Sequence, residues 1–412
     1  MAKETLILVG ASVRALAQSA VAAGFNVWSA DLFGDRDLVE LGPWRKIDDY
    51  PHGLVPLLAE APPGDVIYTG GLENHPDVIE AIGRMRTVLG CSPATLRAVR
   101  DPWQLAPVVA AAGFPMPETQ PLLNSDIESP PDDPKAPYRR VEPWLIKPRQ
   151  SGGGSHIVDA NRVTDADRTR VRRLGVDGFV RQRWIDGFPL SAQFLTVRGR
   201  PHGTRLLGLC RQIGPWARLA GGPFAYRGGI GPWPIWPDLE ERLTTLGAAL
   251  SGQFALTGLY GVDLVTGSDQ WIESYGEPTR LDASGFFHVI EINPRFTASM
   301  ELLEWGGSSL VQSHVAACRG EDLAEQPGRR PRRLGLKAIV YATGSCRWGE
   351  DADTFSQRHS NWLADIPQVG TSFRAGQPVT TIRVAGESLR RLRLMTQTMV
   401  SRLRPCLDPF DG

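Results

Sequence analysis

The residues best suited to chemistry end an apolar segment in the last third of the chain. This segment reads Phe-Phe-His-Val-Ile-Glu-Ile-Asn-Pro-Arg and contains Glu291, Asn293 and Arg295. Side chains two residues apart on a strand face the same side, so Glu291 and Asn293 can offer oxygen atoms to one cation. Mg²⁺ prefers such ligands and usually keeps substrate phosphates in its shell. Arg295 would place a positive charge beside those phosphates, whereas an ordinary strand with a capped end is the alternative.

A second cluster lies far upstream, where Lys147 ends the apolar segment Trp-Leu-Ile-Lys and is followed by Ser151, Gly152, Gly153 and Gly154. Glycine backbone can approach an anion closely and point N–H groups at it, while the ammonium adds charge. Only five of the 45 basic residues are lysines (3, 46, 135, 147 and 337), so a lysine here is informative. The cluster predicts a phosphate site. The alternative is a flexible hairpin loop with a lysine in solvent.

Two further segments could complete a nucleotide site. The strand-like segment that contains Gln182, Arg183, Trp184 and Ile185 can present backbone groups to the edge of a purine, although an ordinary strand and turn explains it as well. Asp263 lies between apolar neighbours in a second strand. A carboxylate there is costly unless it is paired or binds metal, so Asp263 is a candidate third ligand.

Length and composition limit the class of protein. A chain of 412 residues is too long for one core, so two or three packed units are expected. A hydrophobic content of 42% and a formal net charge of zero give no support for a nucleic-acid partner. No run approaches the ~18–20 apolar residues of a membrane span, and no signal-peptide pattern opens the chain. Five scattered cysteines indicate reduced thiols, and we expect a cytoplasmic protein without a membrane partner.

The order of expected elements indicates an open parallel sheet at the start. Residues 5–10, 26–31 and 65–69 read as strands, with a helix at about 13–23. The turn after the first strand lacks the further glycines of a dinucleotide site, which disfavours NAD. The pattern then predicts helices at 76–87, 92–113 and 386–403, and strands at 143–147, 156–159, 178–185, 190–197, 204–212, 258–265, 286–292, 336–342 and 376–384.

Three other stretches carry expectations of their own. The Pro-rich stretch 115–138 is expected to be a loop or domain seam. The Gly/Pro/Trp-rich stretch 213–237 is too long for a plain connection and is expected to be a functional loop. The arginines of the helix at 386–403 are expected to form a solvated surface.

This order of features resembles the ATP-grasp superfamily, and within it the branch of predicted ATP-dependent carboligases related to biotin carboxylase. The resemblance covers nearly the whole chain and rests on the turn at Arg100-Asp-Pro-Trp, the two clusters above, the Gln182 segment, the Asp263 strand and the ending Asp365-Ile-Pro-Gln-Val-Gly. It implies an α/β and α+β protein with a Rossmann-like N-terminal domain, a two-subdomain ATP-grasp fold and a carboxylase-like C-terminal extension. The implied domains are 1–115 (Rossmann-like), 116–188 (lid), 189–325 (central, with the metal site) and 326–412 (extension).

The resemblance also implies roles for the site residues. Lys147 and the glycine loop would contact the phosphates of ATP, and Gln182 would contact the adenine amino group. Arg183 and Ile185 would supply the hinge backbone, and Trp184 lies between them in the same ATP-binding segment. Asp263, Glu291 and Asn293 would hold Mg²⁺, for which Mn²⁺ could substitute. Arg295 would steady an acyl phosphate.

The implied reaction joins a carboxylate to an amine or thiol. The carboxylate attacks the γ-phosphate of ATP, and the acceptor then displaces phosphate from the acyl phosphate, with catalysis mainly by positioning and charge. Small-molecule acids and amines are the expected partners, cofactor biosynthesis (one-carbon carriers) is the expected setting, and a homodimer is compatible with the sequence. The alternatives are a bicarbonate-activating enzyme like biotin carboxylase and a non-catalytic nucleotide-binding subunit.

The chain departs from the family pattern in two places. Asp101-Pro102 stands where the family often has Asp-Lys, so a second phosphate-contacting lysine is missing and the nearby cations are Arg97 and Arg100. The spacing from Asp263 to Glu291 is longer than usual. Glu273 and Asp282, in the intervening insertion, are therefore rivals of Asp263 for the metal.

Substrate specificity is expected from loops at the carboxyl ends of the first strands, where open sheets bind ligands. The candidates for contact with a polar substrate are Ser12, Arg14, Glu73, Asn74 and Arg211. Turn and capping roles are equally open for the first four. Arg227 is expected to lie at the surface.

Overall fold

The first sheet has four parallel strands in the order β3-β2-β1-β4. The structure, a computed structural model, describes residues 3–128, 144–267, 280–304, 309–323 and 333–409. Strands and helices alternate here, because each apolar strand is followed by an amphipathic helix that covers a face. The strands are β1 (Thr5–Val9), β2 (Asn26–Asp31), β3 (Trp44–Lys46) and β4 (Asp65–Tyr68), with the helices α1 (Arg14–Ala22), α2 (Arg36–Val39), α3 (Leu54–Leu57) and α4 (Pro76–Met85). The expected β-α-β opening is confirmed.

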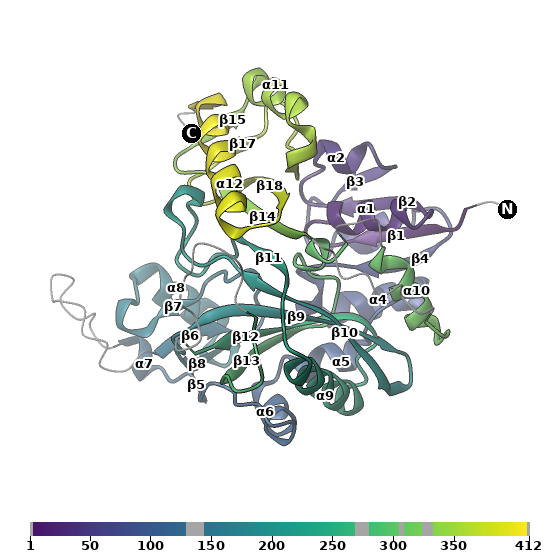
Figure 1. The fold of residues 1–412 in the computed structure, drawn as a ribbon, viewed down its shortest axis with the longest axis vertical. Helices are drawn as coiled ribbons and strands as arrows, with labels where there is room; N and C mark the ends of the chain where they lie inside the picture. Colours follow the sequence, from purple (N-terminus) through teal and green to yellow (C-terminus); the bar gives the residue numbers. More distant parts are fainter. Residues whose placement is uncertain (1–2, 129–143, 268–279, 305–308, 324–332, 410–412) are drawn as a thin grey trace.

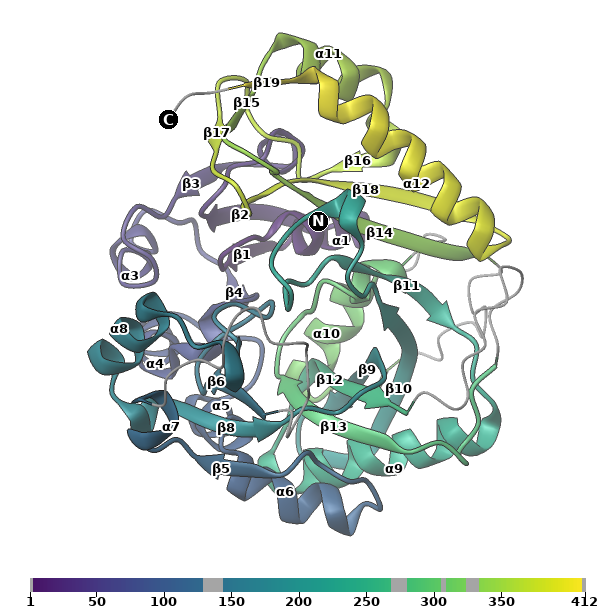
Figure 2. The ribbon, with the colours of Figure 1, turned by 90° about the vertical axis from the view of Figure 1, so that its left-hand side faces the viewer.

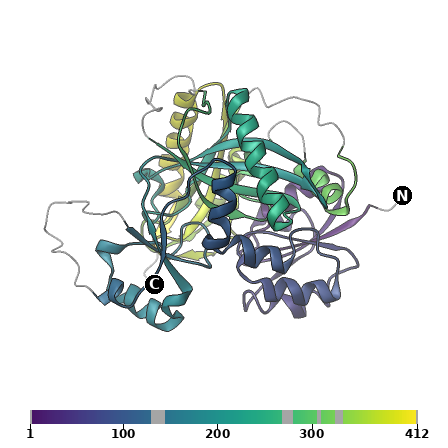
Figure 3. The same cartoon turned by 90° about the horizontal axis from the view of Figure 1, so that it is seen from below.

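Two helices lead from this sheet into a small antiparallel sheet with the order β5-β8-β6-β7. The elements are α5 (Pro93–Val99), α6 (Pro102–Ala111), β5 (Thr119–Pro121), α7 (Ser125–Glu128), β6 (Trp144–Pro148), β7 (Val158–Asp159), α8 (Asp165–Leu174) and β8 (Phe179–Arg183). The small sheet has its own core of six buried residues: Leu122, Ile127, Ile146, Val163, Val171 and Phe179. Figure 3, seen from below, shows the small sheet apart from the first sheet.

A large sheet of eight strands forms the centre of the molecule, in the order β13-β12-β9-β10-β11-β14-β18-β16 (Figure 1). The strands are β9 (Phe188–Val197), β10 (Arg200–Gln212), β11 (Gly228–Trp233), β12 (Gly258–Thr266), β13 (Phe287–Asn293), β14 (Leu334–Tyr341), β16 (Leu363–Ala364) and β18 (Pro378–Gly386). Strand β11 joins the central strands to the C-terminal strands, so one sheet runs through both predicted domains 189–325 and 326–412. The proposed boundary at 325/326 stays a prediction.

Helices and a small third sheet complete the fold. Figure 2 shows α12 lying along β14 and β18. The remaining elements are α9 (Pro237–Phe254), α10 (Leu310–Arg319), α11 (Glu350–Arg358) and α12 (Leu389–Leu403), and the sheet β17-β15-β19 of Ser372–Phe373, Cys346–Trp348 and Leu407–Pro409. Short 3₁₀ turns are η1 (Leu72–Asn74), η2 (Ala160–Arg162), η3 (Val176–Gly178), η4 (Ala217–Leu219), η6 (Met300–Leu302), η7 (Ser360–Trp362) and η8 (Arg404–Cys406). Over the described ranges, no helix is long and apolar enough to cross a membrane.

The interpretation of 213–237 as a single loop is wrong for its second half, which is strand β11. Its glycines read as turn residues, but they allow close strand packing. A Cβ on Gly228 would lie 2.0 Å from the Lys337 carbonyl oxygen, and one on Gly231 would lie 2.5 Å from Cys210 Sγ. The stretch 115–138 likewise contains β5 and α7, and its residues from 129 on lie outside the described part.

The first sheet is fastened to the C-terminal strands through α2. Asp37 accepts hydrogen bonds from the backbone N–H groups of Asp365 and Ile366, at 3.0 and 2.9 Å. The Arg36 N–H donates to the Ile366 carbonyl at 2.7 Å. Asp35, beside them, is buried. This junction therefore gathers several carboxyl groups away from water.

Replacing Asp35 by asparagine is expected to stabilise the protein at high pH. Burial, with the nearby charges of Asp365 and Asp37, raises the pKa of Asp35 to about 8. Because the pKa of Asp35 is higher in the folded than in the unfolded state, this carboxyl group stabilises the fold fully below the unfolded pKa of about 3.9. That stabilisation is lost as the pH rises through about 8. The gain in Tm of Asp35→Asn over wild type should therefore grow between about pH 4 and pH 8. Thermal unfolding at several pH values measures it. The exposed Asp49→Asn serves as control, and a gain independent of pH would contradict the assignment.

Candidate active site

A cleft of about 1410 Å³ lies where the small sheet, the large sheet and the first sheet meet. Most of the residues predicted for the site line it. They are Ser12, Arg14, Lys147, Ser151, Gly152, Gly153, Gly154, Gln182, Arg183, Trp184, Ile185, Arg211, Asp263, Glu291, Asn293 and Arg295. Strands distant in sequence therefore bring the lysine, the glycine loop and the candidate metal ligands to one place.

The three candidate metal ligands lie side by side on neighbouring strands. Asp263 on β12 is the register partner of Glu291 on β13. Asn293, two residues further along β13, donates from Nδ2 to Asp263 Oδ2 at 3.0 Å. Lys147, at the end of β6, reaches across the cleft and places its Nζ 3.0 Å from Glu291 Oε2. The long connection between β12 and β13 thus leaves the pairing of Asp263 and Glu291 intact.

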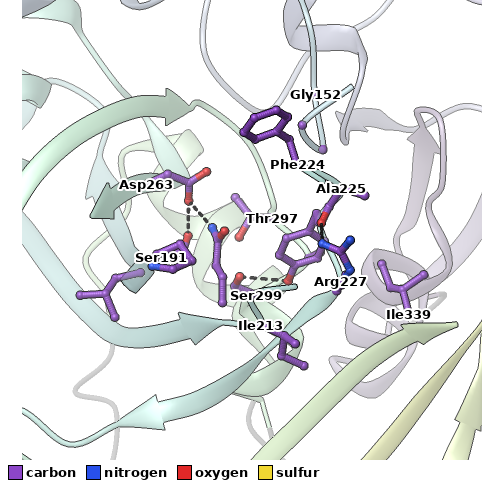
Figure 4. Close-up of a pocket in the computed structure, with 18 of the residues that line it drawn as sticks. Gly152, Ser191, Ile213, Phe224, Ala225, Arg227, Asp263, Thr297, Ser299 and Ile339 are labelled. Atoms are coloured by element: carbon purple, nitrogen blue, oxygen red, sulfur yellow. Dashed lines mark hydrogen bonds between the residues drawn. The ribbon is translucent and has the colours of Figure 1, made fainter. Parts of the chain in front are cut away.

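A chain of hydrogen bonds fixes the Asp263 carboxylate, and Figure 4 shows its last bond, between Ser191 and Asp263. Thr297 Oγ1 donates to Gln193 Oε1 at 2.7 Å, Gln193 Nε2 donates to Ser191 Oγ at 2.8 Å, and Ser191 Oγ donates to Asp263 Oδ1 at 2.6 Å. Gln212 Nε2 also donates to this oxygen at 3.1 Å. Every donor points toward the carboxylate, so each bond strengthens the next. Sequence reasoning missed these residues, although Ser191 and Gln193 form a polar i, i+2 pair within an apolar strand.

The two carboxyl groups have opposite pKa shifts. Burial and the neighbouring Glu291 charge raise the pKa of Asp263. Burial would also raise the pKa of Glu291, but Lys147 and Arg100 outweigh it and lower that pKa below its ordinary value. Two facing carboxylates repel each other unless cations lie between or beside them. Lys147 neutralises one of the two, which leaves a position for a further cation.

The donor set fits Mg²⁺. Asp263, Glu291 and Asn293 offer two carboxylates and one amide oxygen, and Mg²⁺ is usually bound by one or two carboxylates together with substrate phosphates. In the part of the chain that the structure describes, no three His, Cys, Asp or Glu side chains gather into a metal cluster, so an all-protein cage is not built there. Asp282 contacts Ser284 near the start of α9 and does not line the cleft. The other rival, Glu273, lies outside the described residues.

The glycine loop lies over the cleft and is held at both ends. Arg100 Nη2 donates to the Ser151 carbonyl at 2.9 Å, and the Tyr226 N–H donates to the Gly153 carbonyl at 3.0 Å. Gly153 and Gly154 have φ angles of 63° and 76°, which favour glycine. A Cβ on Gly154 would lie 1.7 Å from the Phe224 carbonyl oxygen. The loop therefore packs against residues 224–226, which gives that part of the stretch 213–237 a place at the cleft.

Gly154→Ala is expected to weaken ATP binding by about tenfold, because a Cβ at Gly154 would push the glycine loop away from Phe224 and strain its backbone by about 1–3 kcal/mol. Gly152→Ala is the matched control, since a Cβ there meets nothing within 4 Å. Titration of each variant with ATP measures the effect. Equal ATP affinities of the two variants would show that the packing of Gly154 against Phe224 does not affect ATP binding.

The segment predicted to contact the base lines the cleft on the side of β8. Gln182 is buried, and its Nε2 donates to Thr119 Oγ1 at 3.1 Å. The Arg183 N–H donates to the Glu118 carbonyl at 2.8 Å, so this group is already used within the small sheet. Trp184 donates from Nε1 to Asp186 at 2.7 Å. The base-contacting roles of these residues stay predictions.

Arg100, and not Arg97, lies near the phosphate candidates. Besides Ser151, its guanidinium contacts Asn74 Oδ1 at 2.6 Å and lies 3.9 Å from Glu291 Oε2. Arg97 is half-exposed on α5 and pairs with Glu80. The Asp101-Pro102 pair begins α6, because Asp101 accepts from the Trp103 N–H at 3.0 Å and proline suits the first helical position.

The substrate candidates separate into two groups. Glu73 and Asn74 are buried and do not line the cleft: Glu73 lies 2.7 Å from Arg295 Nε, and Asn74 holds Arg100. Their oxygens thus orient arginines. Ser12 is exposed at the cleft.

Arg14 and Arg211 line the cleft in different ways. Arg14 is fully buried and ion-paired with Glu301 and Asp365. Arg211 packs over the rings of Phe188 and Trp233, at 4.7 and 5.5 Å from their centroids. Arg14 therefore has a structural role at least, while Arg211 presents its charge along an aromatic wall.

One surface prediction is wrong. Arg227 is buried, because its guanidinium donates to four carbonyls of residues 220–225 and so fastens the strand that follows. Figure 4 shows it beside Ala225. Arg390 and Arg391 of α12 are exposed and Arg393 is half-buried, so the predicted solvated surface is confirmed. Arg390 and Arg393 also line the cleft. Sequence alone could not tell which face of α12 meets the cleft.

The sequence of the site region matches a known family. Residues 99–299 match the family model described as the ATP-grasp domain. The match includes Lys147, the glycine loop, Asp263 and Glu291, so the resemblance drawn from the sequence is confirmed. None of the curated proteins compared matches the chain.

Solved structures share the fold of the ATP-grasp domain and of the parts around it. An L-amino acid ligase from Bacillus licheniformis is 16% identical, with a TM-score of 0.65 and full coverage of both chains. A carboxyaminoimidazole ribonucleotide synthase from Aspergillus clavatus, complexed with ATP, is 11% identical, with a TM-score of 0.64 over 98% of this chain and 99% of that one. An ATP complex of biotin carboxylase from Campylobacter jejuni is 12% identical, with a TM-score of 0.64 over 96% and 91%. The expected fold class is confirmed.

Proposed function

We propose that the protein is an ATP- and Mg²⁺-dependent ligase that joins a small-molecule carboxylate to an amine through an acyl phosphate. One observation carries the proposal: Lys147 Nζ lies 3.0 Å from Glu291 Oε2, beside Asp263 and Asn293, in a cleft under a glycine loop. An ammonium and oxygen ligands on two paired strands suit a nucleotide triphosphate with its cation. Two of the similar solved structures hold such a nucleotide.

Each site residue has its own role in the proposed reaction. Lys147 and the N–H groups of the glycine loop bind the phosphates. Bound Mg²⁺ would be held by Asp263, Glu291 and Asn293, and would neutralise charge on the transferred phosphoryl group. Arg295, fixed by Glu73 and 3.2 Å from Asn293 Oδ1, presents positive charge where an acyl phosphate forms. Closure of the loop keeps water from the acyl phosphate, which would otherwise be hydrolysed.

Arg100 takes the place of the missing phosphate-contacting lysine in this proposal. Its contacts to Ser151 and Glu291 place its charge at the base of the glycine loop. A guanidinium can bind two phosphate oxygens at once, whereas an ammonium acts as a point charge. We also propose that the reaction belongs to cofactor biosynthesis and that a thiol can take the place of the amine as acceptor.

The proposed ligase activity is tested by measuring ADP release with each combination from a set of carboxylic acids and acceptors. We expect release that needs both an organic carboxylate and an amine, with a ligated product seen by mass spectrometry. Release that depends on bicarbonate would favour a carboxylase-like reaction. ATP binding without ADP release under any of these conditions would leave a nucleotide-binding subunit and contradict the ligase.

A further inference from the structure

The cleft extends well beyond the candidate nucleotide site. Pockets for one small ligand are commonly ~300–1,000 Å³, and this cleft is about 1410 Å³. Its far wall is made by β14 and α12, which lie together in Figure 2. From these elements Lys337, Ile339, Arg390, Arg393, Leu394 and Gln397 line the cleft. The second substrate therefore has room on the side of α12.

One face of α12 is turned to the cleft. Its lining residues are spaced i, i+3, i+4 and i+7, which is one stripe of a helix: Arg390, Arg393, Leu394 and Gln397. Leu394 is 62% exposed although it is apolar. Arg391, between the stripe residues, is exposed and does not line the cleft. The stripe thus offers charge and apolar surface together.

The charge of Arg390 is not offset within this stripe. Arg390 and Arg393 lie near the beginning of α12, whose first turn has no acidic residue. In the first turn, at the positive end of the helix dipole, the charge of Arg390 is disfavoured. Within the described ranges, the Arg390 guanidinium makes no ion pair that would offset this.

The deeper cations of the same wall are already neutralised. Lys337 is buried and donates to Glu301 Oε2 at 2.6 Å, and Arg14 pairs with the same carboxylate. Basic side chains nevertheless outnumber acidic ones in the cleft lining. The basic lining residues are Arg14, Lys147, Arg183, Arg211, Arg227, Arg295, Lys337, Arg390 and Arg393, and the acidic ones are Asp263, Glu291 and Asp365. A nucleotide would balance only those near Lys147.

We propose that Arg390 and Arg393 bind a second anionic group of the acid substrate, a carboxylate or a phosphate, carried on an apolar body that lies along Leu394 and Ile339. The reactive carboxylate of this substrate lies toward Arg295. The ligase therefore selects acids with two anionic groups over acids with one. This inference rests on the proposed function, because it assigns the α12 wall to the acid substrate.

Binding of three matched probes tests the inference. Benzoate, terephthalate and 4-carboxyphenyl phosphate share a ring and differ in the second anionic group. With Mg²⁺ and ADP at saturation, calorimetry on the wild-type protein should show one or both of the probes with two anionic groups binding at least about tenfold more tightly than benzoate, as expected for charge-assisted hydrogen bonds. The tighter of these two probes identifies carboxylate or phosphate as the group. Arg390→Ala/Arg393→Ala should remove this preference, and the control Arg391→Ala should keep it.

Two outcomes would overturn the inference: equal binding of all three probes to the wild type, or a preference that survives in the double variant. ADP affinity, measured on the same samples, should be unchanged in all variants, which shows that the nucleotide part of the cleft is intact. If the arginine-dependent preference is present but no acid supports ADP release, the anion site stands and the ligase fails. If ADP release occurs without regard to a second anionic group, the ligase stands and the anion site fails.

Discussion

Glu291→Gln is expected to reduce ATP turnover by about 10³-fold or more, which is the scale for loss of a preorganised charge at a reacting phosphate. Glutamine keeps the shape of the side chain but removes the charge that faces Lys147 and, across the strand pair, Asp263. The Glu291 side chain is 23% exposed, so water can solvate a lysine left without its partner. The Tm should therefore change little. ADP release and thermal unfolding measure the two effects.

Asp282→Asn is the matched control for this prediction. Asp282 was a rival metal ligand by sequence, but its neighbour Ala283 donates to Asp238 of α9, and Asp282 lies outside the cleft lining. Its variant should retain turnover. Near-normal activity of Glu291→Gln, or a large loss in Asp282→Asn, would remove the present metal assignment.

Lys147→Ala is expected to raise the dissociation constant of ATP by about 10²-fold, since charge-assisted hydrogen bonds contribute about 1.5–3 kcal/mol and a partly buried phosphate contact lies at the upper end. The Lys147 side chain is 12% exposed and lies at the end of β6, below the glycine loop. No other lysine lines the cleft near this loop among the described residues. Equilibrium titration with ATP and Mg²⁺ measures the change.

Lys46→Ala is the control for lysine loss. Lys46 is 61% exposed on β3, and its partner is the exposed Asp48 at 3.7 Å. Removing it should leave ATP affinity unchanged. An unchanged dissociation constant in Lys147→Ala as well would exclude a phosphate role for Lys147.

The sequence predicted most of the strands that carry the site, because their signals are local. The segments around Lys147, Asp263 and Glu291 are apolar runs with one polar residue at a functional position. Such runs read as strands whatever their neighbours are. Strand β11 was not predicted, since its glycines look like turn residues until the close approach to Cys210 and Lys337 is known. Helix α9 begins with Pro237 and two acidic residues in its first turn, which are ordinary start signals that could have been used.

The sequence predicted the site residues that belong to a recognisable motif. It did not predict the residues that tertiary packing brings to the cleft. The i, i+2 spacing brought Glu291 and Asn293 together without knowledge of the fold. The burial of Arg227 and the position of Arg390 depend on which helix and strand faces meet, and that is decided by contacts far apart in sequence. Glu73 shows the same limit: its turn lies at the expected edge of the first sheet, but its carboxylate points to Arg295 and not to the cleft.

A crystal grown with Mn²⁺ and a non-hydrolysable ATP analogue, measured at a wavelength where manganese scatters anomalously, tests the central claim most directly. We expect an anomalous peak within about 2.0–2.6 Å of oxygens from Asp263, Glu291 or Asn293, the range for hard cations, with the phosphates between Lys147 and the glycine loop. A manganese peak bound elsewhere, with the nucleotide away from Lys147, would contradict the account.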